Sequence, residues 1–288
     1  MKSILVLWRR AAGAALQWRL LLWWVLALAL PTLLVVLPLW RAFSGLLNHA
    51  LASSALALNF DPAMLVEALA GLEKQRFSAV DLGLAGLLLT LLLSPWLTGL
   101  LVTSARANRP LGMGDLFLGG WREYGRLGRM LLWSVVPLGI AAGLGGVLLD
   151  AAGEHGASAT LEADGELLQH LALGFTALLV LVAQASLDAG RAVLALNPHA
   201  RSAVVAWWRG WRLLLGQRGR GLWVYLLISL PALAGLGLLA LLRLHAAPVG
   251  VLGVSAAVLL GLALVVLTAW MRGARLFALI EAGRERGR

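Results

Sequence analysis

The chain lacks cysteine and contains little charge. Of its 288 residues only 13% are Asp, Glu, Lys or Arg, whereas soluble domains carry about 25%. The absence of cysteine excludes disulfides, thiolate metal sites and cysteine nucleophiles. The five histidines are scattered, and none has the paired spacing of a zinc site. No GxSxG elbow or phosphate-binding loop is present either. We therefore expect no catalytic residues, no metal, no cofactor and no enzymatic activity.

Hydrophobic residues dominate instead, at 60% of the chain with a mean hydropathy of +0.85. The formal net charge is +10, and the arginines flank long apolar runs. A nucleic-acid-binding protein would gather such charge on a soluble basic face. This arrangement favours lipid headgroups as the counter-charge and predicts no nucleic-acid partner.

Six apolar runs are long enough to cross a bilayer core of about 30 Å as helices. They occupy residues 20–39, 82–103, 130–149, 167–189, 222–242 and 249–270. The sequence therefore predicts an all-α integral membrane protein, a single membrane domain over 1–288, with six transmembrane helices arranged as three hairpins. Glycines at 139, 143 and 146 recur on one of these runs and predict close helix packing there.

The distribution of basic residues predicts the orientation. Twenty of the 24 Lys and Arg fall in the N-terminal, second, fourth and C-terminal connecting segments. The third connection, 150–166, holds five acidic residues and no basic one. Because basic residues stay on the cytoplasmic side, we expect both termini in the cytoplasm and the protein in the bacterial inner membrane.

Tryptophan and arginine are interleaved just before three of the spans. Residues 206–231 read AWWRGWRLLLGQRGRGLWVYLLISLP, and residues 8–31 have the same layout. On a helical wheel, the segments at the N-terminus, 113–129 and 201–215 each separate an apolar from a basic face, as interfacial helices do. We take the following residues as interfacial lipid-binding candidates: Trp8, Arg9, Trp18, Arg19, Trp121, Arg122, Arg126, Trp208, Arg209, Trp211 and Arg212. Plain anchoring and selective binding of anionic lipid both fit this pattern.

The three interfacial segments divide the chain into pseudo-repeats of about 1–106, 111–191 and 201–275. Trp8, Arg9, Trp23 and Pro31 match residues 200 positions later. The outer loop of the first repeat, 41–81, is long, and Asp61-Pro62 predicts the start of a short periplasmic helix in it.

Few polar residues lie within the spans. Gln184, Asp188 and Arg191 form one group near the cytoplasmic end of the fourth span. One interpretation is a local i,i+3 ion pair at the membrane edge. The other is a polar patch that faces the bundle interior and relays protons or anions.

Residues 198–230, PHARSAVVAWWRGWRLLLGQRGRGLWVYLLISL, carry a short helix pattern (Ala206, Trp211, Leu213) before basic residues and a span. This stretch resembles a group of uncharacterised bacterial polytopic membrane families, which includes the membrane domain attached to some glycerophosphodiester phosphodiesterases. The resemblance implies a multi-pass inner-membrane module with a lipid or envelope role, and no phosphodiesterase activity.

Two functions remain open from the sequence. The first is a non-catalytic accessory, scaffold or lipid-interacting membrane module, whose partners are membrane lipids, anionic ones included, and a protein partner or further copies of the chain. The alternative is a small transporter or permease with a solute or proton path between the hairpin repeats. Buried polar groups near mid-membrane would favour transport, and polar groups at the lipid–water edge would favour the accessory module.

Overall fold

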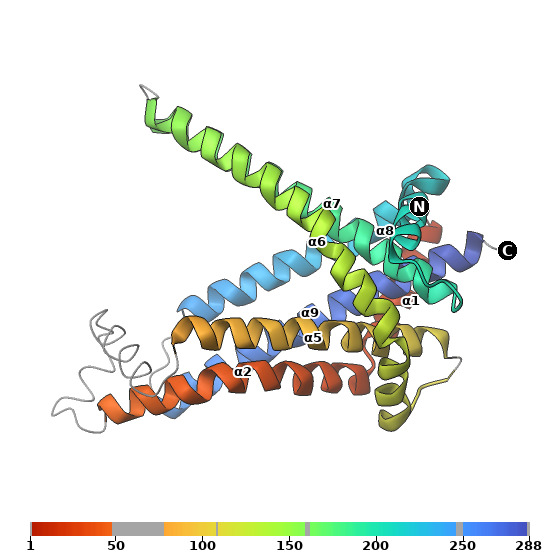
Figure 1. The fold of residues 1–288 in the computed structure, drawn as a ribbon, viewed down its shortest axis with the longest axis horizontal. Coiled ribbons are helices and arrows are strands. Elements are labelled where there is room, and N and C mark those ends of the chain that lie inside the picture. The colour runs from red at the N-terminus through yellow and green to blue at the C-terminus, as the bar shows by residue number, and fades with distance from the viewer. Residues whose placement is uncertain (1, 48–77, 108, 159–161, 246–249, 287–288) are drawn as a thin grey trace. The chain divides into compact units, whose positions relative to one another are not determined.

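A computed structural model describes residues 2–47, 78–107, 109–158, 162–245 and 250–286 (Figure 1). Within these ranges the chain folds into seven α-helices and has no strand. They are α1 (Lys2–Ala15), α2 (Trp18–Leu47), α5 (Ala79–Arg106), α6 (Met113–Ser158), α7 (Glu162–Leu196), α8 (Ala203–His245) and α9 (Gly250–Arg286). The helix expected in the outer loop after Asp61 lies outside the described residues.

All of these helices except α1 contain a segment long and apolar enough to cross a membrane. The segments are Trp18–Ala42, Val80–Arg106, Met113–Gly156, Gly165–Leu196, Gly219–His245 and Val251–Arg286. Large apolar side chains remain exposed along them, among them Leu88, Leu132 and Leu259, as is usual for helices whose solvent is lipid. The predicted all-α fold with six apolar helices is confirmed, and these are the features of a multi-pass membrane protein.

Several helices begin or continue for reasons visible in the sequence. Ser78 precedes α5, and its hydroxyl oxygen accepts the Asp81 amide at 3.0 Å while Asp81 Oδ2 accepts the Ser78 amide at 3.3 Å. This reciprocal pair is a capping box. Ser202 caps α8 in the same way, since its hydroxyl accepts the Val205 amide at 3.3 Å. Five prolines lie inside helices without ending them: Pro31, Pro38, Pro95, Pro137 and Pro231.

The helices form two compact units. Unit 1 comprises Met1–Gln17, Thr98–Pro231 and Trp270–Arg288, and unit 2 comprises Trp18–Leu97 and Ala232–Ala269. Unit 1 therefore contains α1, α6, α7, the end of α5, the first part of α8 and the end of α9. In unit 2, α2 and α5 pack at Gly86, where a methyl group would meet Val35, and Trp23 meets Trp96 edge-on at 5.3 Å between ring centroids.

Within unit 1, α6 and α7 form an antiparallel hairpin (Figure 1, green). Gly156 and Gly165 face each other near its tip, and the Thr176 hydroxyl lies 3.4 Å from the Gly145 carbonyl further along. Glycine also permits the close approach of α7 and α8, because a methyl group on Gly210 would lie 2.6 Å from the Gly190 amide nitrogen. Among the described residues, no neighbouring helix lies within reach of such a methyl group on Gly139, Gly143 or Gly146. The sequence therefore predicted close packing at the wrong glycines of α6.

The three expected interfacial segments differ in how they join the spans. A turn at Leu16 and Gln17 separates α1 from α2. Residues 113–129 continue without interruption into the rest of α6, although Figure 1 shows the first turns of α6 running in a different direction from its long remainder. Residues 201–215 likewise continue within α8, where Gly219 has a φ of 73°. Such a positive φ is one that glycine adopts at little cost and that redirects a helix.

Candidate functional site

Asp188 is the centre of a polar cluster that three helices of unit 1 build. Its Oδ1 accepts a hydrogen bond from Arg191 Nη1 on the same helix, α7, at 2.6 Å. Its Oδ2 accepts one from the Tyr225 hydroxyl on α8 at 3.2 Å. The Arg275 guanidinium, from α9, lies over the Tyr225 ring with its carbon 4.8 Å from the ring centroid. We call these four residues the stacked cluster.

The stacked cluster lies inside unit 1 and not at its surface. Tyr225 is 0% exposed and Arg275 7%, while the side chains of Asp188 and Arg191 are 14% and 19% exposed. Within the described residues, Arg275 Nε is buried and has no hydrogen-bond partner. Arg272 adds a further positive charge close enough to interact with Asp188, Arg191 and Arg275. Within the stacked cluster, Asp188 is the one acid and Arg191 and Arg275 are the two cations, so the cluster carries a formal charge of +1.

This geometry bears directly on the two interpretations of Gln184, Asp188 and Arg191. The predicted i,i+3 ion pair between Asp188 and Arg191 is present, but it also faces other helices, as the second interpretation required. Gln184 is half-buried one turn earlier and makes no hydrogen bond to the cluster in the described part of the chain. Tyr225 and Arg275 were missed by the sequence reasoning. The available signal was Tyr225, one of only two tyrosines, because it lies in an apolar run that offers its hydroxyl no partner.

A second group of arginines lies where α7 ends. Arg106 Nη1 and Arg126 Nη1 bind the two oxygens of Glu123 at 2.5 and 2.7 Å. Arg106 also donates to the carbonyls of Leu194 and Ala195, at 3.1 and 2.7 Å. We call Arg106, Glu123 and Arg126 the capping cluster, because these carbonyls lack partners within the helix and cations are favourable at a helix C-terminus.

The capping cluster corrects the expectation for Arg126. Its side chain is 14% exposed and donates to the carbonyls of Leu194, Asn197 and Ala200 at 2.8, 2.6 and 3.0 Å. Because the donors of Arg126 are engaged inside unit 1, it is not a lipid-facing residue. The wheel had placed it on the basic face of 113–129, where nothing in the sequence indicated that the end of α7 lay beside it.

The other interfacial candidates divide by exposure. Arg9, Arg122, Arg209 and Arg212 are exposed, as are Trp18, Trp121 and Trp208. Trp8, Arg19 and Trp211 are half-buried. In unit 2, the Arg19 guanidinium lies 5.5 Å from the Trp18 ring centroid. In unit 1, Trp211 meets Trp207 edge-on at 6.2 Å, and the Trp207 indole donates to the Ser186 hydroxyl at 2.9 Å.

The start of α8 packs closely through small residues and leaves some of its large apolar ones exposed. Ala203, Ala206 and Gly210 are buried, whereas Val204 and Leu215 are exposed. The close approach at Gly190 and Gly210 explains this orientation, because only small side chains fit between two backbones. The exposed face thus combines Trp208, Val204 and Leu215 with Arg209 and Arg212, the composition of an interfacial surface.

Comparison of the chain with protein-family models, curated proteins and solved structures gives no match. Among the described residues, no three His, Asp or Glu side chains lie together as metal ligands would. The exposed arginines can bind anions, and the stacked cluster holds an ion pair between the helices of unit 1.

Proposed function

We propose that this protein is a non-catalytic, multi-pass module of the bacterial inner membrane that binds anionic lipid at its cytoplasmic face. Its six spans form three hairpins, each preceded by a cytoplasmic interfacial helix, with both termini in the cytoplasm. The observation that carries the proposal is the set of exposed arginines on α1, together with the exposed arginines and tryptophans at the starts of α6 and α8. The resemblance of residues 198–230 to bacterial membrane modules supports the same role.

The chemistry of these three segments suits the headgroup layer. Tryptophan places an apolar ring among acyl chains while its indole N–H finds a polar partner. Exposed arginines beside a span attract anionic lipid by about 1 kcal/mol each. Trp208, with 61% of its surface exposed, and Arg209 and Arg212 beside it present both chemistries on one stretch of α8.

Lipid retention tests this function. The protein would be purified in mild detergent, and its bound phosphatidylglycerol would be counted by native mass spectrometry. We expect the double variant Arg209→Gln/Arg212→Gln to retain less of this lipid than wild type. The matched control is Arg243→Gln, because Arg243 is an exposed arginine near the other end of α8 and no other Lys or Arg lies within twenty positions of it in the sequence. Equal retention in wild type and the double variant would contradict the proposal.

The stacked cluster favours a second candidate, a transporter with a proton or solute path. Asp188, Arg191, Tyr225 and Arg275 all lie within segments apolar enough to span a membrane, and ionisable groups buried there commonly serve transport. In proteoliposomes with an imposed membrane potential and an internal pH-sensitive dye, this candidate predicts a proton flux that Asp188→Asn abolishes. A wild-type flux equal to that of empty liposomes would exclude a proton path.

A further inference from the structure

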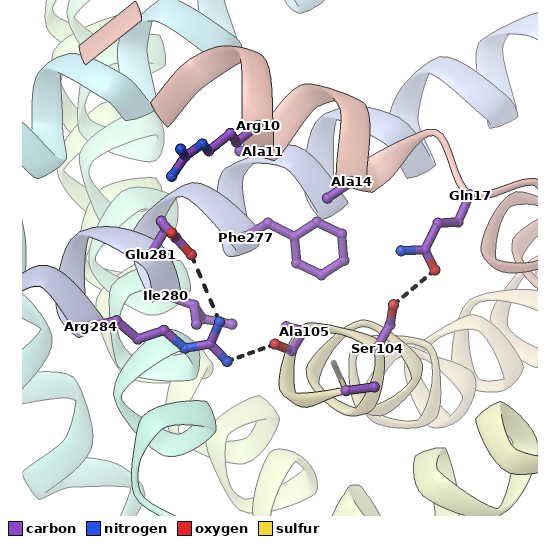
Figure 2. Close-up of a pocket in the computed structure, with 11 residues that line it drawn as sticks. Arg10, Ala11, Ala14, Gln17, Ser104, Ala105, Phe277, Ile280, Glu281 and Arg284 are labelled. Carbon is purple, nitrogen blue, oxygen red and sulfur yellow. Dashed lines mark hydrogen bonds and ion pairs between the residues drawn. The ribbon is translucent and has the colours of Figure 1, made fainter. Parts of the chain in front are cut away.

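A cavity of about 230 Å³ lies in unit 1 between α1, the end of α5 and the end of α9 (Figure 2). Its lining is apolar in the middle, where Phe277, Ile280 and Ala14 contribute, and polar at its edges. Arg10, Glu281 and Arg284 stand at one edge, and Gln17 and Ser104 at the other. This division into an apolar floor and polar edges is suited to an amphipathic ligand.

The walls of the cavity are held in place by buried contacts. On α1, Ala11 and Ala15 are buried, and a methyl group on Gly273 of α9 would lie 3.3 Å from the Ala15 side chain. The Trp270 indole on α9 donates to the Ala12 carbonyl at 3.0 Å. These contacts fix α1 against α9 while leaving the basic face of α1 exposed.

Several polar groups of the cavity are already engaged with one another. Gln17 Oε1 accepts the Ser104 hydroxyl at 3.0 Å. Arg284 donates to the Ala105 carbonyl at 2.7 Å and lies 3.7 Å from the Glu281 carboxylate (Figure 2).

Two donors in the lining remain available. Figure 2 shows the amide nitrogen of Gln17 turned toward the cavity, while its oxygen points to Ser104. Arg10 is exposed and makes no ion pair within the part of the chain that the structure describes. With two arginines and one glutamate in its lining, the cavity has a formal charge of +1. A ligand that matches it is an anion rich in acceptor oxygens, such as a phosphate group.

The position of the cavity selects the source of that phosphate. Gln17 immediately precedes the segment Trp18–Ala42, and Ser104 and Ala105 end the segment Val80–Arg106. Both segments are apolar enough to span a membrane, so the cavity lies at their ends, at the depth of the lipid headgroups. Phe277 and Ile280 then face the glycerol and the first methylenes of a lipid.

We propose that this cavity is a specific site for an anionic phospholipid of the cytoplasmic leaflet, with Arg10 as the ligand of its phosphate and the Gln17 amide as a donor to another oxygen of the same lipid. The proposal rests on the proposed function for the orientation of these helix ends. It goes further by assigning one bound lipid to one site, separate from the general attraction of the basic surface.

Arg9 and Arg10 provide a matched pair for the test. They are adjacent and both exposed on α1, but only Arg10 lines the cavity. If lipid is attracted only by surface charge, replacing either arginine should lower the lipid affinity equally. If the cavity is a specific site, only the replacement of Arg10 should lower it.

The experiment titrates full-length protein in micelles with phosphatidylglycerol and resolves the tightest-binding lipid by native mass spectrometry. We expect Arg10→Gln to lower the affinity for this lipid by about tenfold, because one charge-assisted interaction is lost. Arg9→Gln should leave the affinity nearly unchanged. Gln17→Glu, which keeps the shape but adds a negative charge at the other edge of the cavity, should also weaken lipid binding. Equal effects of Arg9→Gln and Arg10→Gln would overturn the site.

A competition arm separates the two sources of phosphate. A lipid site predicts that inorganic phosphate does not displace bound phosphatidylglycerol, because the ion cannot replace the contacts to Phe277 and Ile280. Displacement by inorganic phosphate would overturn the assignment to a lipid. Suppose that Arg209→Gln/Arg212→Gln lowers the total bound lipid, while Arg10→Gln and Arg9→Gln have the same affinity for the tightest-binding lipid. The specific site is then contradicted and the proposed function stands. If no variant changes retention, both fail.

Discussion

The capping cluster and the stacked cluster use the same side chain in opposite ways. In the capping cluster, Arg106 and Arg126 share Glu123 and also donate to carbonyls at the end of α7. In the stacked cluster, Arg275 lies on a tyrosine ring, and its buried Nε has no partner among the described residues. The first arrangement closes a helix, whereas the second keeps positive charge available inside unit 1.

The difference separates architecture from candidate function. An arginine whose donors are all satisfied stabilises the fold, and removing it leaves carbonyls and a carboxylate without partners. A partly neutralised buried cation costs stability, so its presence calls for an explanation other than folding. Substitutions in the two clusters should therefore differ in the size of their effect on the free energy of unfolding.

The largest effect is expected at the capping cluster. Arg126→Met should lower the free energy of unfolding by about 3 kcal/mol, because it leaves the α7 carbonyls and part of the Glu123 charge without a partner. Chemical unfolding in detergent micelles measures it. Arg129→Met is the control, since Arg129 is exposed and donates only to the Gly125 carbonyl of its own helix in the described structure. Equal effects at both positions would show that the cap contributes nothing.

Arg275→Met should have a smaller effect, within about 1 kcal/mol of wild type and in either direction. The substitution removes the cation–π contact with Tyr225, but it also removes a poorly satisfied buried charge. The same unfolding assay measures it beside Arg126→Met. A loss as large as that of Arg126→Met would contradict the distinction between the two clusters.

Tyr225→Phe should cost about 1 kcal/mol, the usual value of one hydrogen bond, since the ring remains beneath Arg275. A double-mutant cycle with Asp188→Asn tests whether the hydroxyl acts through Asp188. We expect the cost of Tyr225→Phe to shrink when Asp188 is replaced. An unchanged cost would mean that the hydroxyl contributes through another group.

The smallest effect on stability is expected at the interface. Arg209→Gln should leave the unfolding midpoint unchanged in neutral detergent, because its side chain is exposed and surface substitutions rarely matter. In liposomes containing phosphatidylglycerol the same variant should bind fewer anionic lipids, and added salt should reduce the difference. A large loss of stability in neutral detergent would place Arg209 in the fold and not at the lipid surface.

The sequence predicted those features that depend on local composition. The six apolar helices follow from run length alone. The apolar face of α1 follows from its periodicity, although Leu7, Ala11 and Ala15 on it are buried by protein and not by lipid. The Asp188–Arg191 pair was also predictable, because residues three apart on a helix are neighbours.

Features that depend on contacts between distant segments were not predictable. Arg126 resembled its exposed neighbour Arg122 until the end of α7, about seventy residues away, was placed beside it. The close approach of α7 and α8 was also not predictable, because it depends on Gly190 and Gly210, which lie twenty residues apart in the sequence. Arg275 would have been interpreted as an ordinary cytoplasmic arginine, since only the packing of α8 and α9 brings Tyr225 beneath it.

The most direct test of the account is the side of the membrane on which each helix connection lies. The chain has no cysteine, so single cysteines can be introduced without background labelling. We predict that a membrane-impermeant thiol reagent labels His155→Cys and His245→Cys in intact spheroplasts, and labels His199→Cys only after permeabilisation. Labelling of His199→Cys in intact spheroplasts, with protection at the other two positions, would contradict the orientation on which the lipid-binding proposals depend.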